Sequence, residues 1–209
     1  METPPRAPVA PGQKAPDFSL PAADREGTVT LAEYRGRRVL LALFRGLYCP
    51  FCRHQIARLA MTAAKLRDHG VETLGVVATA AHRARLYFRF HEARMRLAAD
   101  PDLVTHRAYG VPGIPMTPEL GQVLNEVAFA FAREHGLPAT LGTAHDDINA
   151  FDGYRPTAED KADFARHQAQ LTAQFLIDGE SVVRWSNIER VPTDFPSDAE
   201  LLATITGAR

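Results

Sequence analysis

Residues 39–53 read VLLALFRGLYCPFCR and hold both cysteines of the chain, Cys49 and Cys52. The apolar run that opens this stretch has the length of a strand buried on both faces. Pro50 is tolerated in the first turn of a helix, where its missing N–H would have no partner. Apolar residues then recur at helical spacing until Gly70, which favours a helix end. The stretch therefore predicts a strand that delivers Cys49 to the N-terminus of a helix.

That position changes the chemistry of the first thiol. Unpaired N–H groups and the positive end of the helix dipole favour a thiolate. In a Cys-X-X-Cys motif, the pKa of the first thiol can fall from about 8.5 to roughly 3.5 to 7.5. Arg45 and Arg53 are close enough in sequence to add positive potential, although either could point to solvent. We expect Cys49 to attack a disulfide or a peroxide, and Cys52 to close the ring and release the product.

Three other roles for the two cysteines stay open. A zinc knuckle needs four ligands, and the sequence offers neither a second Cys-X-X-Cys nor a paired-histidine motif. Inert buried cysteines are common in protein cores. A structural disulfide at this spacing would close a very short loop and stabilise little. The eight histidines form no ligand set, with His54 read as a helix-surface residue. We therefore expect redox chemistry with no metal and no cofactor.

Composition narrows the class of protein. The chain has 209 residues, 45% of them hydrophobic and 23% charged, which suits one domain with an insertion. A formal charge of -1 argues against a nucleic-acid partner. Residues 1–11 are rich in Pro and Ala and are predicted to form a disordered leader, not a signal peptide. No apolar run is long enough to span a membrane, so a cytoplasmic location is the default expectation.

The rest of the chain alternates predicted strands and helices, as in an α/β sheet. We expect, in order, short strands around 16–30, a helical turn over 31–34, a strand over 71–78, a helix over 80–95, a strand over 96–99 and a helix over 103–109. The helix over 80–95 should bury Leu86 and Phe90. A turn at Asp178-Gly179 should join two final strands, and Ser197 should cap the last helix.

Residues 112–171 form a segment of about sixty residues, far longer than an ordinary connection. Thr117-Pro118 and Thr157 mark the starts of two helices within it. Residues 137–156 between them are rich in turn-forming residues and are predicted to be loop. We expect the helices to cover the sheet or a partner subunit, in preference to forming a lid that selects substrate.

Several landmarks occur in a fixed order along the chain. They are GQKAPDFSL at 12–20, CPFC at 49–52, the strand at Val71, the DPD and AYGV pieces of 100–111, and FLID at 175–178. Together they resemble the alkyl hydroperoxide reductase and thiol-specific antioxidant (peroxiredoxin-like) family. The resemblance covers roughly two thirds of the chain. It implies a thioredoxin-like α/β fold over 12–209, with a central mixed sheet flanked by helices, an N-terminal extension and the insertion 112–171 before the last two strands.

The chain departs from this family at the site itself. Typical members carry a proline and a threonine seven and three residues before the reactive cysteine, where this chain has Ala42 and Gly46. Neither can supply the threonine's hydrogen bond. The position of the family's arginine, which is a cis-proline in thioredoxins, is Thr172. Our hypothesis is that Arg45 replaces the missing arginine.

We therefore expect a peroxiredoxin-like thiol oxidoreductase that cycles a Cys49/Cys52 dithiol and disulfide. The supporting residues are Arg45, Gly46, Tyr48, Pro50 and Thr172. Its expected partners are a disulfide or hydroperoxide substrate, an unidentified thiol reductant and a second copy of the chain in a homodimer. Two alternatives stay open, a hydroperoxide reductase in which Cys49 passes through a sulfenic acid, and a non-catalytic binding or scaffold module.

Overall fold

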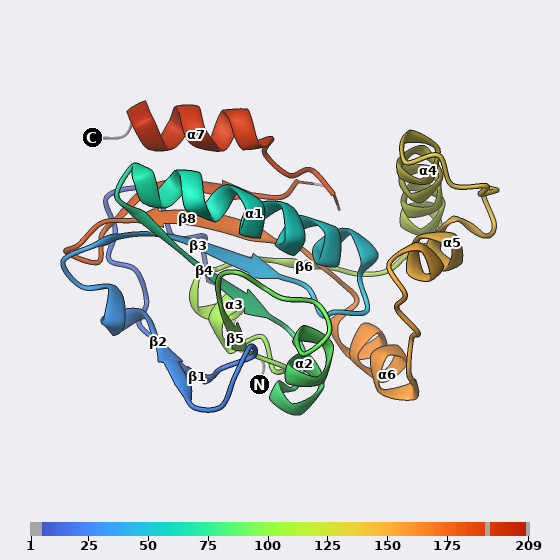
Figure 1. Cartoon of the computed structure of the whole chain (residues 1–209), viewed down its shortest axis with the longest axis horizontal. Coiled ribbons are helices and arrows are strands. Elements are labelled where there is room, and N and C mark those ends of the chain that lie inside the picture. Colours follow the sequence, from blue (N-terminus) through green and yellow to red (C-terminus); the bar gives the residue numbers. More distant parts are fainter. Residues whose placement is uncertain (1–5, 191–192, 208–209) are drawn as a thin grey trace.

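A five-stranded mixed sheet forms the centre of the fold (Figure 1). The computed structural model describes residues 6–190 and 193–207. The strand order is β5-β4-β3-β8-β9. Strands β3, β4 and β5 run parallel to one another, and β8 runs antiparallel to both of its neighbours, β3 and β9. The bounds are β3 Arg38–Phe44, β4 Val71–Val77, β5 Arg96–Ala99, β8 Ala173–Ile177 and β9 Val183–Ile188. The predicted mixed sheet flanked by helices is confirmed.

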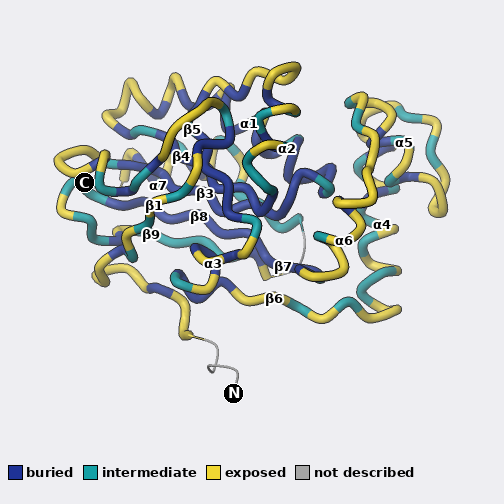
Figure 2. The backbone as a smooth tube through the Cα atoms, turned by 90° about the horizontal axis from the view of Figure 1, so that it is seen from below, coloured by how far each residue is buried: buried dark blue, intermediate teal, exposed yellow. Residues whose placement is uncertain are grey.

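Side chains of β3 alternate between two buried layers, because successive residues of a strand point to opposite faces. Leu40 and Phe44 pack in a cluster with the helices α1 (Pro50–Asp68), α2 (Ala81–Phe88) and α7 (Asp198–Gly207). Leu41 and Leu43 pack in a second cluster with the N-terminal segment. The inner strands β3, β4 and β8 are therefore buried on both faces and are mostly dark blue in Figure 2.

The N-terminal region follows the sequence pattern. Strands β1 (Ser19–Pro21) and β2 (Thr28–Thr30) form an antiparallel pair, and a short helix, η1 (Leu31–Tyr34), begins with a capping box between Thr30 and Glu33. Of the predicted leader, residues 1–5 lie outside the described residues. Val9 is 2% exposed, and its N–H donates to the Tyr109 carbonyl at 3.0 Å. The packed part of the chain thus begins before the predicted boundary at Gly12.

The predicted helix over 80–95 is wrong in length and in orientation. Helix α2 ends at Phe88, and Arg94 has a φ of 48°, which a helix cannot contain. Ala84 and Phe88 are buried, whereas Leu86 and Phe90 are 55% and 76% exposed. Ala84 and Phe88 are four positions apart and form the buried face of the helix. Leu86 lies two positions from each of them and therefore points to another face.

The insertion carries three helices, α4 (Pro118–Glu134), α5 (Ala144–Phe151) and α6 (Ala158–His167). Short strands β6 (Gly113–Ile114) and β7 (Ala169–Gln170) pair antiparallel and bring its two ends together. Figure 1 places these helices beyond the C-terminal end of β3. The predicted caps are confirmed, since the Thr117 and Thr157 side chains accept from the Leu120 and Asp160 N–H groups.

Helix α5 contradicts the predicted loop over 137–156. It has no side-chain cap, but Asp146 and Asp147 lie in its first turn, where acidic groups favour a helix. Ala144 and Ile148, four residues apart, are buried in the main core. Tertiary packing thus forms a helix that local propensity does not announce.

The C-terminal part agrees with the prediction. Helix α3 (Val104–Ala108) follows β5, and the turn at Asp178 joins β8 to β9 through a bond from its N–H to the Val182 carbonyl. Ser197 caps α7, accepting from the Glu200 N–H at 3.2 Å. No helix in the described ranges combines the length and the apolar character that crossing a membrane requires.

Candidate functional site

Cys49 and Cys52 lie at the start of α1, where β3 delivers them. Cys49 is the N-cap residue and is 8% exposed, whereas Cys52 is fully buried, and both are free thiols. The loop between β3 and α1 is fixed by the Leu47 N–H, which donates to Thr79 Oγ1 at 2.8 Å. A Cβ on Gly46 would lie 2.5 Å from the Tyr48 ring and 2.9 Å from the Ala78 carbonyl oxygen. Gly46 therefore allows the tight loop that presents Cys49.

Arg45 points at the thiol and not at solvent. It is 5% exposed, and its Nε donates to Cys49 Sγ at 3.4 Å. Nη1 donates to the Gln170 carbonyl at 3.0 Å and to Glu189 at 2.8 Å, and Nη2 donates to Glu189 at 3.2 Å. A guanidinium has five N–H groups, so one of them remains without a partner in the described part of the chain.

Glu189 is a site residue that the sequence did not reveal. It directly follows β9, is 1% exposed, and accepts from the Thr172 N–H at 2.9 Å as well as from Arg45. Its own N–H donates to the Thr172 carbonyl at 3.0 Å. Thr172 thus joins the site through its backbone. Glu189 and Arg45 are 144 positions apart, so no local spacing could have paired them.

The two thiols have opposite pKa shifts. Burial alone would raise the pKa of Cys49, but the hydrogen bond from Cys52 and the charge of Arg45 outweigh burial and hold that pKa well below its ordinary value. Burial raises the pKa of Cys52 well above its ordinary value, and the nearby Cys49 and Glu189 charges raise it further. The two shifts together favour a thiolate at Cys49 and a protonated thiol at Cys52 that donates to it.

Arg53 makes its hydrogen bonds to groups other than the thiols. It donates to Asp152 at 2.7 Å, to Asn149 at 2.7 Å and to the Leu47 carbonyl at 2.6 Å. Its guanidinium also lies 4.0 Å from the centre of the Tyr154 ring. The sequence left the direction of both arginines open. Arg45 faces the thiol, and Arg53 joins α1 to α5.

A cavity of about 520 Å³ opens on Cys49. Its core side is formed by the reactive stretch, including Arg45, Tyr48 and Pro50, and its other side is formed by the insertion, including Leu124 and Phe164. The insertion helices therefore enclose the space in front of the thiol. The insertion also packs against the main core through Ala128 and Ile148.

Tyr48 lies between the thiol and the insertion. Its ring meets the edge of the Phe164 ring with centres 5.7 Å apart. Its buried hydroxyl has no hydrogen-bond partner among the described residues, and burial raises the pKa of Tyr48, so the hydroxyl keeps its proton. Tyr48, a residue of the cavity lining, thus carries a buried proton donor without a partner.

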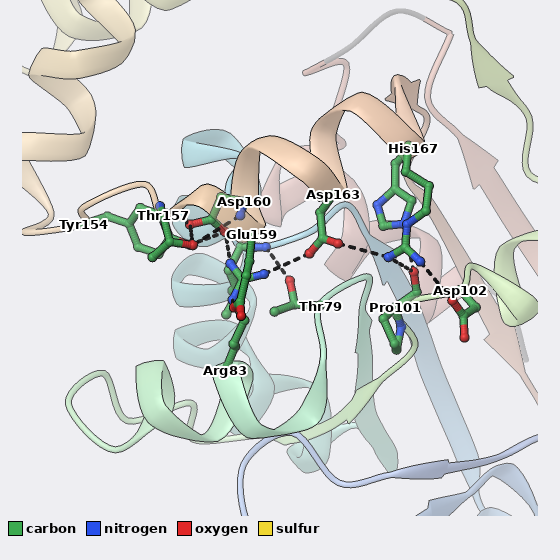
Figure 3. Close-up of polar contacts among 12 residues, drawn as sticks. Thr79, Arg83, Pro101, Asp102, Tyr154, Thr157, Glu159, Asp160, Asp163 and His167 are labelled. Carbon is green, nitrogen blue, oxygen red and sulfur yellow. Dashed lines mark hydrogen bonds and ion pairs between the residues drawn. The ribbon is translucent and has the colours of Figure 1, made fainter.

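Helix α6 is held to the core by Arg83 of α2 (Figure 3). Arg83 pairs with Glu159 at 3.1 Å, with Asp163 at 2.9 Å and with Asp160. Asp160 also accepts from the Tyr154 hydroxyl at 2.8 Å. The acidic side chains of α6 therefore pair with α2, and Asp160 also lines the cavity.

A second set of contacts fixes the other end of α6, also drawn in Figure 3. His167 Nε2 donates to the Pro101 carbonyl at 2.8 Å, and Arg166 donates to Asp102 at 3.0 Å. Both partners belong to the Asp100-Pro101-Asp102 turn. Asp100 itself accepts from the Val104 and Thr105 N–H groups at 3.0 and 2.7 Å and starts α3.

Solved structures of thioredoxin-fold proteins superpose on nearly the whole chain. Reduced 2-Cys peroxiredoxin of Plasmodium vivax matches with a TM-score of 0.62 and 16% identity, over 95% of this chain and 81% of that chain. A structure from Chlorobium tepidum named as the thiol:disulfide interchange protein DsbE matches with a TM-score of 0.58 and 21% identity, over 96% and 98% of the two chains. At these identities the likeness shows the fold.

Sequence relatives carry peroxiredoxin names. Peroxiredoxin Bcp of Escherichia coli K12 is 29% identical over 106 residues, which is 51% of this chain and 67% of that protein. A Mycobacterium tuberculosis H37Rv relative named among the peroxiredoxins is 30% identical over 105 residues, 50% of this chain and 66% of that protein, or just under two thirds of its length. The sequence model of the AhpC/TSA family matches residues 11–186. The chain therefore belongs to the AhpC/TSA family.

Proposed function

We propose that the protein is a thiol peroxidase in which Cys49 attacks a hydroperoxide and Cys52 resolves the product. One observation carries the proposal: the Arg45 Nε, 3.4 Å from Cys49 Sγ, lies with that sulfur in a cavity of small-molecule size. The peroxiredoxin relatives support it. The resolving partner lies in the first turn of the same helix, and its thiol is protonated when Cys49 is not.

The reaction has two steps on the protein. The Cys49 thiolate attacks the terminal oxygen of the hydroperoxide, so an S–O bond forms, the O–O bond breaks, and the alkoxide leaves and takes a proton as an alcohol. Cys49 is then a sulfenic acid. The Cys52 sulfur attacks the Cys49 sulfur, and the hydroxyl leaves with the Cys52 proton as water. An unidentified thiol reductant returns the Cys49–Cys52 disulfide to two thiols and is itself oxidised.

Arg45 supplies the electrostatics of the first step. Its charge stabilises the thiolate, and its uncommitted N–H can hydrogen-bond to the peroxide oxygens, where negative charge develops. Glu189 acts as a positioning residue, because its two bonds to Arg45 fix the guanidinium plane. The Tyr48 hydroxyl is assigned as a second donor to the hydroperoxide. Together these groups would supply the hydrogen bonding that a threonine gives typical family members at the position of Gly46.

The dithiol itself favours a second candidate, exchange with small disulfides. Cys-Pro-Phe-Cys is a thioredoxin-type motif. A protein disulfide is disfavoured, because Cys49 is 8% exposed, Cys52 is fully buried, and the insertion covers the approach. Oxidised glutathione is small enough to test the remaining possibility.

Quenched-flow alkylation followed by mass spectrometry separates the two candidates. The reduced protein is mixed with hydrogen peroxide, with cumene hydroperoxide or with oxidised glutathione, and the loss of free Cys49 is timed. The proposal predicts that at least one hydroperoxide reacts many times faster than oxidised glutathione. Slow reaction with both peroxides and fast reaction with the disulfide would replace the peroxidase by the second candidate.

A role for the insertion, taken from the cavity lining, and two expectations from the sequence belong to this proposal. The insertion 112–171 is proposed to be a lid on the domain 12–209. A homodimer is proposed from the family resemblance, and sedimentation velocity would test it. A cytoplasmic location is proposed from the sequence, and fractionation of the native cells would test it.

A further inference from the structure

The charges that line the Cys49 cavity do not cancel. Arg45 is balanced by Glu189, with which it forms two hydrogen bonds. Asp160, also at the wall, pairs with Arg83, which it shares with Glu159 and Asp163. Lys161 lines the same cavity, is exposed, and has no ion-pair or hydrogen-bond partner among residues 6–190 and 193–207. One ammonium group without a contact partner in the described part of the chain therefore borders the space in front of the thiol.

The acidic residues of α6 have an ion-pair partner, whereas Lys161 has none among the described residues. Its acidic residues Glu159, Asp160 and Asp163 all pair with Arg83, as Figure 3 shows. Lys161 and Phe164 lie three positions apart, so they share a face of the helix, and both line the cavity. The face of α6 toward the thiol therefore presents one ammonium group beside an aromatic ring.

The remaining wall is mostly apolar, with Phe51, Met116, Leu124 and Phe164 among the lining residues. His145 adds no positive charge near neutral pH, because burial lowers its pKa. A volume of about 520 Å³ is within the range of pockets that hold drug-sized ligands, and far exceeds what hydrogen peroxide needs. The space suits a molecule with a long apolar body.

From this charge pattern we infer that Lys161 is an anchor for the carboxylate of an amphipathic substrate, a hydroperoxide of a fatty-acid-like carboxylic acid. A single ammonium is a point charge that matches a monoanion. Within the described residues the cavity is lined by one arginine, Arg45, whose guanidinium is bound to Glu189, so no free guanidinium is available for bidentate binding of a phosphate. The apolar body would lie along the aromatic and aliphatic wall and bring its hydroperoxide to Cys49. The inference rests on the proposed function for the chemistry at Cys49, but the anchor is a separate site.

The kinetic test compares linoleic acid hydroperoxide with its methyl ester, below their aggregation concentrations and at low ionic strength. The acid should react faster than the ester with the unmodified protein. Lys161→Gln should lower the acid-to-ester rate ratio about two- to five-fold, the size of an exposed ion pair. Lys161→Arg should restore the ratio. Lys65→Gln, at an exposed lysine of α1 outside this cavity, should leave the ratio unchanged.

A binding test does not depend on the peroxidase reaction. Oleate is titrated calorimetrically into the Cys49→Ser protein with and without Lys161→Gln, and the second change should weaken binding about two- to five-fold. Lysine-dependent binding of oleate by a protein that reduces no peroxide would keep the anchor and reject the peroxidase. Normal peroxide reduction, with equal acid-to-ester ratios and equal oleate affinities in both proteins, would reject the anchor.

Discussion

At the scale of single residues, the site depends on the buried ion pair between Arg45 and Glu189, which the sequence does not predict. The sequence predicts a lowered Cys49 pKa from its place at a helix N-terminus, and the structure agrees in direction. It does not predict that Arg45 turns inward, because that orientation depends on Glu189 and on the Gln170 carbonyl, both distant along the chain. Local chemistry is readable from sequence, whereas the partners of a buried charge require the fold.

Arg45→Ala should raise the Cys49 pKa, because the nearest positive charge is removed while burial, which disfavours the thiolate, remains. The rate of alkylation by iodoacetamide is followed from pH 4 to 10. In the unmodified protein the rate should stay high at pH 7 and fall only in more acidic solution. In the variant its midpoint should move to higher pH, and peroxide oxidation should slow by roughly 100-fold. An unchanged alkylation profile would remove Arg45 from the account.

Glu189→Ala should destabilise the fold, since it leaves a buried guanidinium without its counter-charge. Breaking such a pair costs roughly 3 to 5 kcal/mol of the free energy of unfolding. Urea unfolding measures the loss in the free energy of unfolding. Glu159→Ala is the matched control, because Glu159 is 63% exposed and its ion pair is worth about 1 kcal/mol or less. Equal losses in the two variants would contradict the role given to Glu189.

At the scale of elements, prediction succeeded where a helix carries its own start signal. Thr117, Thr157 and Ser197 marked three helix starts, because a cap is a contact between neighbours in sequence. Helix α5 has no such cap and was missed. The buried face of α2 was wrong because Leu86 is apolar but faces away from the core. Packing against distant elements decides such cases.

Arg83→Ala should loosen α6, because the buried Asp160 loses its positive partner. The measured quantity is the ratio of two rates of Cys49 modification, by a bulky pyrenyl maleimide and by iodoacetamide. We expect this ratio to rise several-fold as the lid opens to the larger reagent. Arg85→Ala is the control, since Arg85 contacts Glu26 and the Ala22 carbonyl and not the insertion. A ratio that rises equally in both variants would argue against a lid held by Arg83.

At the scale of the whole molecule, the central sheet could be predicted from the sequence, whereas the role of the insertion could not. Ordered landmarks along the chain predicted the mixed sheet, and the structure confirms it. The insertion was expected to cover the sheet or a partner; it packs Ala128 and Ile148 into the main core and also forms one wall of the cavity that opens on Cys49. Its amphipathic pattern alone could not distinguish these roles, because an apolar helix face can pack against a core, a subunit or a substrate.

The most direct measurement is the fate of the sulfur after one turnover with a stoichiometric hydroperoxide. Mass spectrometry with dimedone present should find a Cys49–Cys52 disulfide in the unmodified protein and a dimedone adduct on Cys49 in Cys52→Ser, because the sulfenic acid then has no resolving thiol. Cys49→Ser should consume no peroxide. Peroxide consumption by Cys49→Ser at the rate of the unmodified protein would contradict the account.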